Sequence, residues 1–349
     1  MGLVNILPIK TTPTSHVLAT DYPILTAVLL GLGALSLGKF LVKTLGVLLQ
    51  TFILPGKSLN KYGATKGAWA VVTGASEGIG REYALQLAKK GFNVLVMARN
   101  KPALDALVNE IGSMTVAGKK IEAVALAMDF SKVDDVAQWN AFQSAIENKD
   151  IGVLVNNVGR SQSFPADFVD APVEEVDSIL SININSVVKV TRAVLPGMIQ
   201  RRRGLILSSG SFAGITVVSP MLAPYAASKV FLSSFNAALA AEVKGKGIDV
   251  ETTNTHFVVS NMSKIRKSSV LVPTPKQYVK AVLSKIGLPC GALFTGRPAL
   301  STPYWSHSLL DYVVNLIGWK SVITGVVHNM HIDIRKRALR KLEREAKKQ

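Results

Sequence analysis

Short apolar runs alternate with segments of helical period along most of the chain after residue 67. The first run, Ala68–Val72, leads into a glycine-rich turn and then a helical pattern over Arg81–Lys90. Strands that alternate with helices form right-handed βαβ units. The pattern therefore predicts an α/β fold with a doubly wound parallel sheet covered by helices on both faces. The further apolar runs of strand length are residues 93–98, 121–127, 151–155, 204–207 and 248–253.

A longer apolar segment precedes this pattern. Every residue over Ile24–Leu37 is apolar, Gly, Thr or Ser, and the apolar character resumes after Lys39 and Lys43 as far as Leu54. A helix of about 20 residues crosses the hydrocarbon core of a bilayer, and lysine side chains near its end reach the interface. We therefore expect residues 22–42 to form an N-terminal transmembrane anchor, with the turns up to Leu54 along the membrane surface.

The lysines around this segment indicate its orientation. Lys10 precedes the apolar run, and five lysines follow it between residues 39 and 66. The positive-inside rule then places the bulk of the chain in the cytoplasm. A cleaved signal peptide is the alternative, but its charged region would hold only Lys10, and no small-residue cleavage site precedes the folded part. We expect an anchor and linker over residues 1–67, a folded domain over 68–300, and an apolar segment with a basic tail over 301–349.

A second apolar stretch lies near the end of the chain. Residues 309–327 are apolar but are interrupted by Asp311, Asn315 and Lys320. Charged and amide side chains are costly in the interior of a membrane. We therefore expect a buried or interfacial helix here, with a second membrane span as the alternative.

The composition narrows the class of protein. Hydrophobic residues make up 48% of the 349-residue chain and charged residues 18%, with a mean hydropathy of +0.29. These values exclude a disordered chain and favour a folded core with a membrane-directed segment. The single cysteine, Cys290, excludes an internal disulfide or a multi-cysteine metal site and fits a reducing compartment.

The net charge of +17 suggests nucleic-acid binding, so its distribution along the chain matters. Residues 1–68 hold six basic groups against one acidic group, and residues 331–349 hold eight against three. The central part lacks a basic stripe interleaved with aromatic residues, which is the pattern that stacks bases. We therefore expect no nucleic-acid partner. Basic flanks beside an apolar segment fit the anionic cytoplasmic face of a membrane.

A glycine-rich turn joins the first strand to the first helix, where helix N-terminal amides can hold a dinucleotide pyrophosphate. Gly74 permits the tight turn, Gly78 lets the backbone approach a phosphate, and Gly80 lets the helix pack close to the strand. Ser76 and Ile79 complete the candidate cofactor site. The spacing is not G-x-G-x-x-G, and glycine-rich turns also close ordinary βα units. The strand before the turn and the helix after it favour the cofactor site.

The second strand ends at Arg99 and Asn100, where an NAD-selective site would place a carboxylate against the ribose 2′-hydroxyl. A guanidinium at this place favours the 2′-phosphate of NADP(H). We therefore expect NADPH/NADP as the cofactor. The alternative is a solvated arginine at the end of a strand.

Tyr225 and Lys229 stand one helical turn apart, on the same face of a helix. A lone Y-x-x-x-K is a weak signal, because Tyr62 and Lys66 match it as well. The position of Tyr225 beyond the fifth strand and after a serine cluster separates the two. The cluster consists of Ser208, Ser209 and Ser211.

These residue types fit the reduction of a ketone, which needs hydride on carbon and a proton on oxygen. Lys229 would lower the pKa of the Tyr225 phenol, so that Tyr225 donates the proton. Ser211 would hydrogen-bond the developing alkoxide, with Ser209 as the alternative. Asn185 would order a water that returns the proton through Lys229. Alternatively, it is a helix-interior asparagine bonded to the backbone.

In their order and spacing, these motifs resemble those of the short-chain dehydrogenase/reductase family, over about residues 68–265. The resemblance implies a Rossmann-type fold, a nicotinamide cofactor and a Ser/Tyr/Lys/Asn catalytic group. It also places Asp129 near the adenine, Asn156 along the cofactor, and Val258 with Ser260 near the nicotinamide. The motifs are Thr73–Gly80, Asn156-Asn157-Val158-Gly159, Asn185, the serine cluster and Tyr225-x-x-x-Lys229.

The flanks are similar to those of the fungal very-long-chain 3-oxoacyl-CoA reductases, which are membrane enzymes of fatty-acid elongation. This narrower resemblance rests on the apolar N-terminal segment, residues 210–212, residues 257–266 and residues 302–307. It implies a long-chain 3-oxoacyl-CoA substrate, an endoplasmic-reticulum membrane location, and elongase, 3-hydroxyacyl-CoA dehydratase and enoyl-reductase partners. The interval from Ser211 to Tyr225 is one residue longer than the family pattern, and residues 346–349 only partly match a dilysine retrieval signal.

Two other functions share parts of this pattern. A membrane-bound hydroxysteroid or retinoid dehydrogenase would carry every catalytic motif and differ in the region from 261 to 310. A catalytically silent anchored scaffold would retain the nucleotide fold without the intact proton-transfer group. His328 and His331 have helical i, i+3 spacing without a carboxylate partner, so we expect no metal site. The sequence leaves chain-length preference and oligomeric state open.

Overall fold

The computed structural model describes residues 22–347. The expectations for residues 1–21 of the anchor region, and for Lys348 and Gln349 of the retrieval signal, lie outside the described residues. The chain divides into two compact units with the boundary between Gly46 and Val47. Each unit is described by itself.

Helix α2 (Pro23–Leu48) makes up the described part of the first unit and runs two residues into the second. It covers residues 23–42 of the predicted segment 22–42, and the large apolar side chains of that stretch are exposed, whereas Val47 near its end is buried. With the π-helical turn η1 (Leu49–Ile53), it forms the one helix among residues 22–347 that is long and apolar enough to cross a membrane. An apolar N-terminal helix that can serve as a membrane anchor is thus present.

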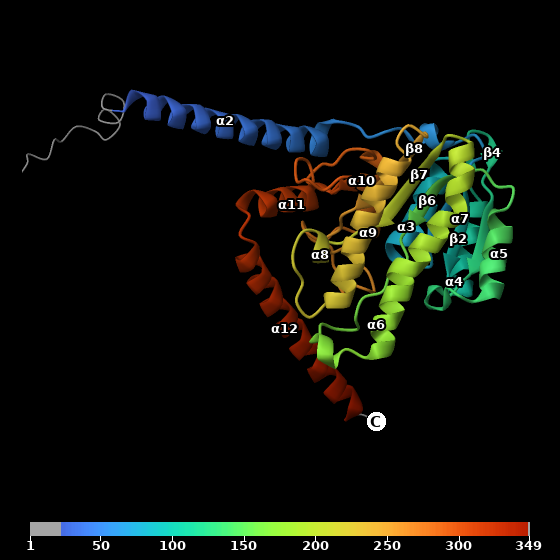
Figure 1. The fold of residues 1–349 in the computed structure, drawn as a ribbon. Helices are drawn as coiled ribbons and strands as arrows, with labels where there is room; N and C mark the ends of the chain where they lie inside the picture. Colours follow the sequence, from blue (N-terminus) through green and yellow to red (C-terminus); the bar gives the residue numbers. More distant parts are fainter. Residues whose placement is uncertain (1–21, 348–349) are drawn as a thin grey trace, which may run out of the picture. The chain divides into compact units, whose positions relative to one another are not determined.

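The second unit is built on a parallel sheet of seven strands in the order β5-β2-β1-β6-β7-β8-β9 (Figure 1). The predicted doubly wound α/β fold is confirmed. Strand β9 was not predicted, because its two residues are too few to give a periodic signal; they pair with Thr252 and Thr253. The strands are β1 (Trp69–Thr73), β2 (Asn93–Ala98), β5 (Ala123–Ala127), β6 (Ile151–Asn156), β7 (Gly204–Ser209), β8 (Ile248–Thr253) and β9 (Leu300–Ser301), and a separate hairpin pairs β3 (Thr115–Val116) with β4 (Lys119–Lys120).

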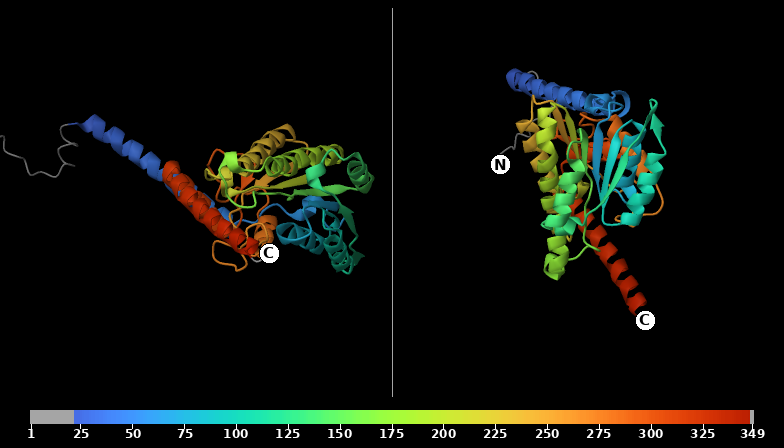
Figure 2. Two further views of the ribbon diagram at one scale, coloured as in Figure 1. Left: turned by 90° about the horizontal axis from the view of Figure 1, so that it is seen from below. Right: turned by 90° about the vertical axis from the view of Figure 1, so that its right-hand side faces the viewer.

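Helices cover both faces of this sheet, so the domain has two hydrophobic cores (Figure 2). Neighbouring strand residues point to opposite faces: Val72 packs in one core with α3, α4 and α10, and Val71 in the other with α5, α7 and α9. Burial on both faces explains why the central strands are continuous apolar runs. These helices are α3 (Gly78–Lys89), α4 (Lys101–Gly112), α5 (Val136–Ile146), α7 (Ser186–Gln200), α9 (Ala223–Glu242) and α10 (Pro275–Ser284).

Several helix starts follow local capping rules. Thr274 and Gln277 form a capping box at the start of α10, with Pro275 in the first turn.

Shorter elements connect the main ones. They are the 3-10 turns η2 (Leu59–Tyr62), η3 (Phe130–Lys132) and η4 (Phe168–Asp170), the helix α6 (Val173–Leu180), the π-helical turn η5 (Ser181–Asn185) and the short α8 (Phe212–Ile215).

The segment before β1 packs into the core of the second unit, although the sequence pattern suggested a linker. Tyr62 is fully buried, and its hydroxyl donates a hydrogen bond to Asp249 Oδ2 over 2.7 Å. Leu59 belongs to the same core. One short turn, η2, brings both residues inward, and a single turn gives no periodic signal in the sequence.

The C-terminal apolar stretch forms parts of two helices. Gly318, with φ of 69°, ends α11 (Trp305–Ile317), and α12 (Lys320–Ala346) follows. Neither helix qualifies as a candidate span within residues 22–347. Asp311, near the middle of α11, is fully buried and ion-paired with Arg297, which fixes this helix to the protein.

Candidate active site

The glycines of the glycine-rich turn differ in the space around them. A Cβ on Gly74 would lie 2.8 Å from Val158 Cα, and one on Gly80 would lie 2.1 Å from the Gly74 oxygen. On Gly78 (φ +58°) the nearest atom would be Ser260 Cβ at 3.9 Å. Gly74 and Gly80 are therefore required by packing, whereas Gly78 faces space that a ligand can enter.

The first amides of α3 fit a phosphate. Helix α3 starts at Gly78, and the side chain of its N-cap residue Glu77 makes no capping hydrogen bond. Glu77 instead accepts a hydrogen bond from Asn261 Nδ2 over 2.5 Å. Amides at a helix start attract anions through their N–H groups and the helix dipole. Ser76 and Ile79 flank this position and are partly buried.

Arg99 and Asp129 lie at the adjacent carboxyl ends of β2 and β5, whose last residues pair in parallel register. The Arg99 side chain is exposed. Partial burial tends to raise the pKa of Asp129, but hydrogen bonds from Ser131 and the charge of Arg99 bring it below its usual value. Asn100 accepts a hydrogen bond from Ala103 N over 3.1 Å, so its side chain caps α4.

The two asparagines at the end of β6 have different roles. The buried Asn156 donates from Nδ2 to Thr191 Oγ1 over 2.9 Å, inside the core. Asn157 donates from Nδ2 to the carbonyl oxygens of Thr73 and Gly74, both at 3.1 Å, and accepts from Ser209 Oγ over 3.3 Å. Asn157 thus ties the glycine-rich turn to β7. The sequence indicates Asn157 only as a member of the Asn156–Gly159 motif.

Val258 and Ser260 follow β8. Val258 is buried in the hydrophobic core. Ser260 stands opposite Gly78, and its hydroxyl accepts a hydrogen bond from Ser263 N over 3.1 Å. Ser260 therefore lies beside the space in front of the glycine-rich turn.

Helix α9 presents Tyr225 and Lys229 to the end of β7. Lys229 Nζ donates to the Ser209 carbonyl oxygen over 2.7 Å and lies 5.7 Å from the centre of the Tyr225 ring. The Ser211 hydroxyl lies close enough to the Tyr225 phenol to lower its pKa. Of the two serines considered, Ser211 thus lies beside Tyr225, whereas the Ser209 hydroxyl turns toward Asn157.

Burial dominates the protonation of this pair. It lowers the pKa of Lys229 to about 8. It also raises the pKa of Tyr225, although the Ser211 hydroxyl opposes the shift. The net shift of the Tyr225 pKa is therefore upward, opposite to the lowering expected from Lys229, because burial has the largest effect on this phenol. Tyr225 is accordingly a protonated phenol at neutral pH and can donate its proton.

The structure brings Asn183 to the site, and the expectation for Asn185 is wrong. Asn183 is fully buried, accepts from Arg160 N over 2.8 Å, and donates to Ser228 Oγ over 2.8 Å. A Cβ on Gly159 would lie 3.5 Å from Lys229 Nζ and 3.6 Å from Asn183 Oδ1, so these groups converge. Asn185 is exposed. Both residues lie in the π-helical turn η5, where a helical period of 3.6 does not tell which side chain faces inward.

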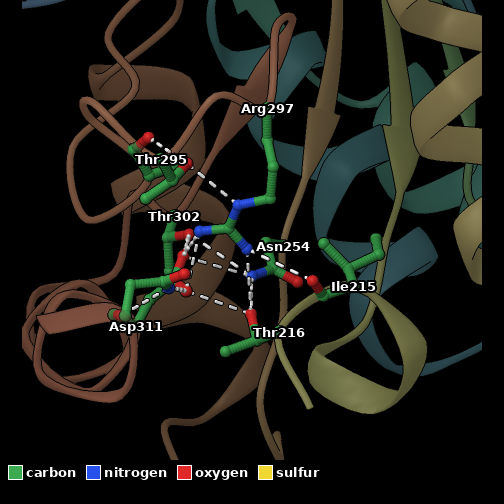
Figure 3. A network of polar contacts seen from close by, with 9 residues as sticks. Ile215, Thr216, Asn254, Thr295, Arg297, Thr302 and Asp311 are labelled. Carbon is green, nitrogen blue, oxygen red and sulfur yellow. Dashed lines mark hydrogen bonds and ion pairs between the residues drawn. The ribbon is translucent and has the colours of Figure 1, made fainter. Parts of the chain in front are cut away.

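A buried polar network holds the turn that carries Ser211 (Figure 3). The Arg297 guanidinium binds both Asp311 oxygens, at 2.9 and 3.0 Å. Thr216, directly after α8, donates to Asp311 Oδ1 over 3.1 Å and accepts from Asn254 Nδ2 over 2.7 Å. Ser211 itself caps α8 by accepting from Ala213 N. The network therefore links the Ser211 turn to β8 and α11.

A phosphate-binding turn at the first βα junction, tied through Asn157 to a Ser/Tyr/Lys group, defines an oxidoreductase that uses a dinucleotide. The chain belongs to the short-chain dehydrogenase family, whose model, described as short chain dehydrogenase, matches residues 57–270. It is 54% identical to the very-long-chain 3-oxoacyl-CoA reductase of Laccaria bicolor, over 96% of this chain and 97% of the relative. It is 44% identical to the protein of the same name from Mycosarcoma maydis, over 91% of each chain.

Solved structures agree with this family. The 3-ketoacyl-(acyl-carrier-protein) reductase from Brucella melitensis complexed with NADH is 26% identical, with a TM-score of 0.55, over 68% of this chain and 96% of that chain. A 7beta-hydroxysteroid dehydrogenase has a TM-score of 0.63 at 21% identity, over 75% of this chain and 96% of that chain. At that identity, the second likeness concerns the fold alone.

Proposed function

We propose that the protein reduces long-chain and very-long-chain 3-oxoacyl-CoA to 3-hydroxyacyl-CoA with NADPH, in fatty-acid elongation. The 54% identity with the Laccaria bicolor reductase, over nearly the whole of both chains, carries this proposal. The likeness to a hydroxysteroid dehydrogenase is limited to the fold.

The bound nicotinamide supplies the hydride, and the side chains of this chain handle the proton. The Tyr225 phenol donates its proton to the carbonyl oxygen of the substrate. The Ser211 hydroxyl, which lies beside that phenol, stabilises the charge that develops on the same oxygen. Lys229 and Asn183, which converge at Gly159, hold the path along which the proton of Tyr225 is restored.

The choice of NADPH is supported by Arg99, which takes the place of a selective carboxylate at the end of β2. Its exposed guanidinium is suited to a ribose 2′-phosphate. The first turn of α3 would hold the pyrophosphate, opposite Ser260. Asp129, at the end of the next strand, would lie toward the adenine.

The acyl substrate would approach along the loop from Asn261 to Pro273. The side chains of Met262, Val270 and Leu271 in this loop are apolar and exposed. An apolar surface next to the glycine-rich turn suits a long hydrocarbon chain.

The enzyme would be anchored in the endoplasmic-reticulum membrane, with its catalytic domain in the cytoplasm. The apolar helix and the lysines that follow it support this orientation. Its partners would be the elongase, the 3-hydroxyacyl-CoA dehydratase and the enoyl reductase. Protease treatment of sealed microsomes tests the orientation: the domain after Trp69 should be digested without detergent, and protection until detergent is added would reverse the assignment.

NADPH oxidation by the purified microsomal protein tests the reaction. The proposal predicts turnover with a long 3-oxoacyl-CoA and much less with a ketosteroid. Preference for the ketosteroid would favour a membrane-bound steroid dehydrogenase instead. The absence of oxidation with either substrate, in protein that still binds NADPH, would favour a silent scaffold.

A further inference from the structure

Helix α11 buries several polar side chains and exposes several apolar ones. His307, Ser308 and Asp311 are buried on its inner face. Val313, Leu316 and Ile317 are large, apolar and exposed. A helix on the surface of a water-soluble domain shows the opposite distribution. The outer face of α11 therefore needs an apolar partner.

The start of α12 also exposes apolar side chains. Trp319, directly before the helix, is 68% exposed, and Val322 and Val326, one helical turn apart on the same side of α12, are 58% and 65% exposed. Both helices lie at the outside of the domain in Figure 1. We call these residues, together with Met330, the α11–α12 apolar face: Val313, Leu316, Ile317, Trp319, Val322, Val326 and Met330.

We propose that the α11–α12 apolar face is seated in the interfacial layer of a phospholipid bilayer. The last turn of the candidate span supports this occupant. Thr51, in η1, is buried against α11, with its Oγ1 2.6 Å from Ser308 Oγ. Thr51 and Ser308 both belong to the second unit, so α11 packs against the turn that follows α2. With α2 in a membrane, this turn would lie near the lipid headgroups.

The charges of α12 also favour lipid. Its second half and the following Lys347 hold seven basic residues, against two acidic ones from Arg335 onward. Anionic headgroups attract such a segment, and amphipathic helices with basic polar faces bind at the interface. A second copy of the chain is a poorer partner, because it has a net charge of +17, whereas anionic lipid headgroups complement the basic half of α12.

The inner face of α11 connects this surface to the active site. Ser306 Oγ donates to the Val270 carbonyl oxygen over 2.7 Å, and a ring nitrogen of His307 lies 3.1 Å from the Leu271 carbonyl oxygen. Asp311 accepts from Thr216, next to α8. The helix that rests on lipid thus also supports the loop with exposed apolar residues. Under the proposed function, an acyl chain dissolved in the membrane would reach the site along that loop.

Lipid quenching of tryptophan fluorescence tests this contact in the full chain. A variant that keeps only Trp319 carries Trp69→Phe, Trp139→Phe and Trp305→Phe, and is reconstituted into phosphatidylcholine and phosphatidylserine vesicles. Brominated lipid should remove roughly half or more of its emission, since interfacial helices place apolar side chains at acyl-chain depth. A matched variant that keeps only Trp139, on α5, should be quenched little. Equal, weak quenching of both tryptophans would overturn the proposal.

Charge substitutions separate lipid from a protein partner. Val322→Glu with Val326→Glu should raise the water exposure of Trp319 in vesicles, whereas Val136→Glu on α5, at a side chain 70% exposed, should not. Cross-linking tests the dimer. Efficient disulfide formation between two copies of Trp319→Cys, together with weak lipid quenching in the variant that keeps only Trp319, would assign the face to a dimer and overturn the proposal. Quenching needs no substrate, so a failure of the reductase assay would leave this result intact.

Discussion

Lys229 Nζ donates a hydrogen bond to the Ser209 carbonyl oxygen over 2.7 Å, which joins helix α9 to the end of β7. The ammonium lies 5.7 Å from the centre of the Tyr225 ring and, like Asn183 Oδ1, close to Gly159. The lysine therefore supports the site through its position and its charge, while Tyr225 stays protonated.

The pH dependence of the reaction follows from these two groups. Burial lowers the pKa of Lys229 to about 8 and raises that of Tyr225, so the form with both protons prevails below about pH 8. We expect kcat/KM to fall by about tenfold per pH unit above that value. Arginine keeps its charge at these pH values. In Lys229→Arg, kcat/KM should therefore no longer fall above about pH 8, whatever the level of its activity. An unchanged decline in Lys229→Arg would show that another group titrates.

Arg99 should control the choice of cofactor. Arg99→Asp places a carboxylate where the 2′-phosphate of NADPH would lie, and repulsion should raise the KM for NADPH by about tenfold or more. The KM for NADH should change much less. Lys101→Asp, a charge reversal at the nearby exposed start of α4, is the matched control. Equal efficiency of the parent protein with NADH and NADPH would contradict this role of Arg99.

Asn183 and Asn185 offer a direct comparison of two neighbouring amides. Asn183→Ala removes the partner of Arg160 N and of Ser228, so kcat should fall by about tenfold or more, with a loss of stability of about 1–3 kcal/mol. Asn185→Ala, at an exposed position, should change neither quantity measurably. Steady-state kinetics and urea unfolding check both. A larger loss of kcat in Asn185→Ala would restore the original assignment.

Asp311 should be essential for stability. Asp311→Asn leaves the Arg297 guanidinium without its charged partner, and breaking such a buried pair costs about 3–5 kcal/mol. Since Arg297 keeps some exposure, we expect the lower end of that range in the free energy of unfolding. Arg297→Leu combined with Asp311→Asn should recover part of the loss, because no unpaired charge remains. The absence of recovery would show that the surrounding hydrogen bonds, and not the charge pair, carry the stability.

The arrangement of the sheet was predictable because each central strand is buried on both faces and reads as an apolar run. Strand β9 was missed because two residues carry no pattern. The η2 turn was read as linker for the same reason, although Tyr62 is fully buried. These elements depend on contacts with distant residues, such as Asp249, that local sequence does not reveal.

In the candidate site, the order of the motifs predicts the glycine-rich turn and the Tyr225/Lys229 pair, because each depends on a fixed spacing of residues along one element. The inward-facing asparagine was missed, because a π-helical turn changes the helical phase. The direction of the Tyr225 pKa was also missed. It depends chiefly on desolvation by burial, which is a property of the folded domain.

The central claim is that Tyr225 is the proton donor in NADPH-dependent reduction. Turnover of a long 3-oxoacyl-CoA by Tyr225→Phe tests it most directly. Loss of a general acid costs about 10² to 10⁴ in rate, so kcat should fall by that factor while the Kd for NADPH stays nearly unchanged. The control, Tyr62→Phe, loses only a structural hydrogen bond to Asp249 and should keep kcat with a slightly lower melting temperature. Full activity in Tyr225→Phe, or an equal loss of kcat in Tyr62→Phe, would contradict the account.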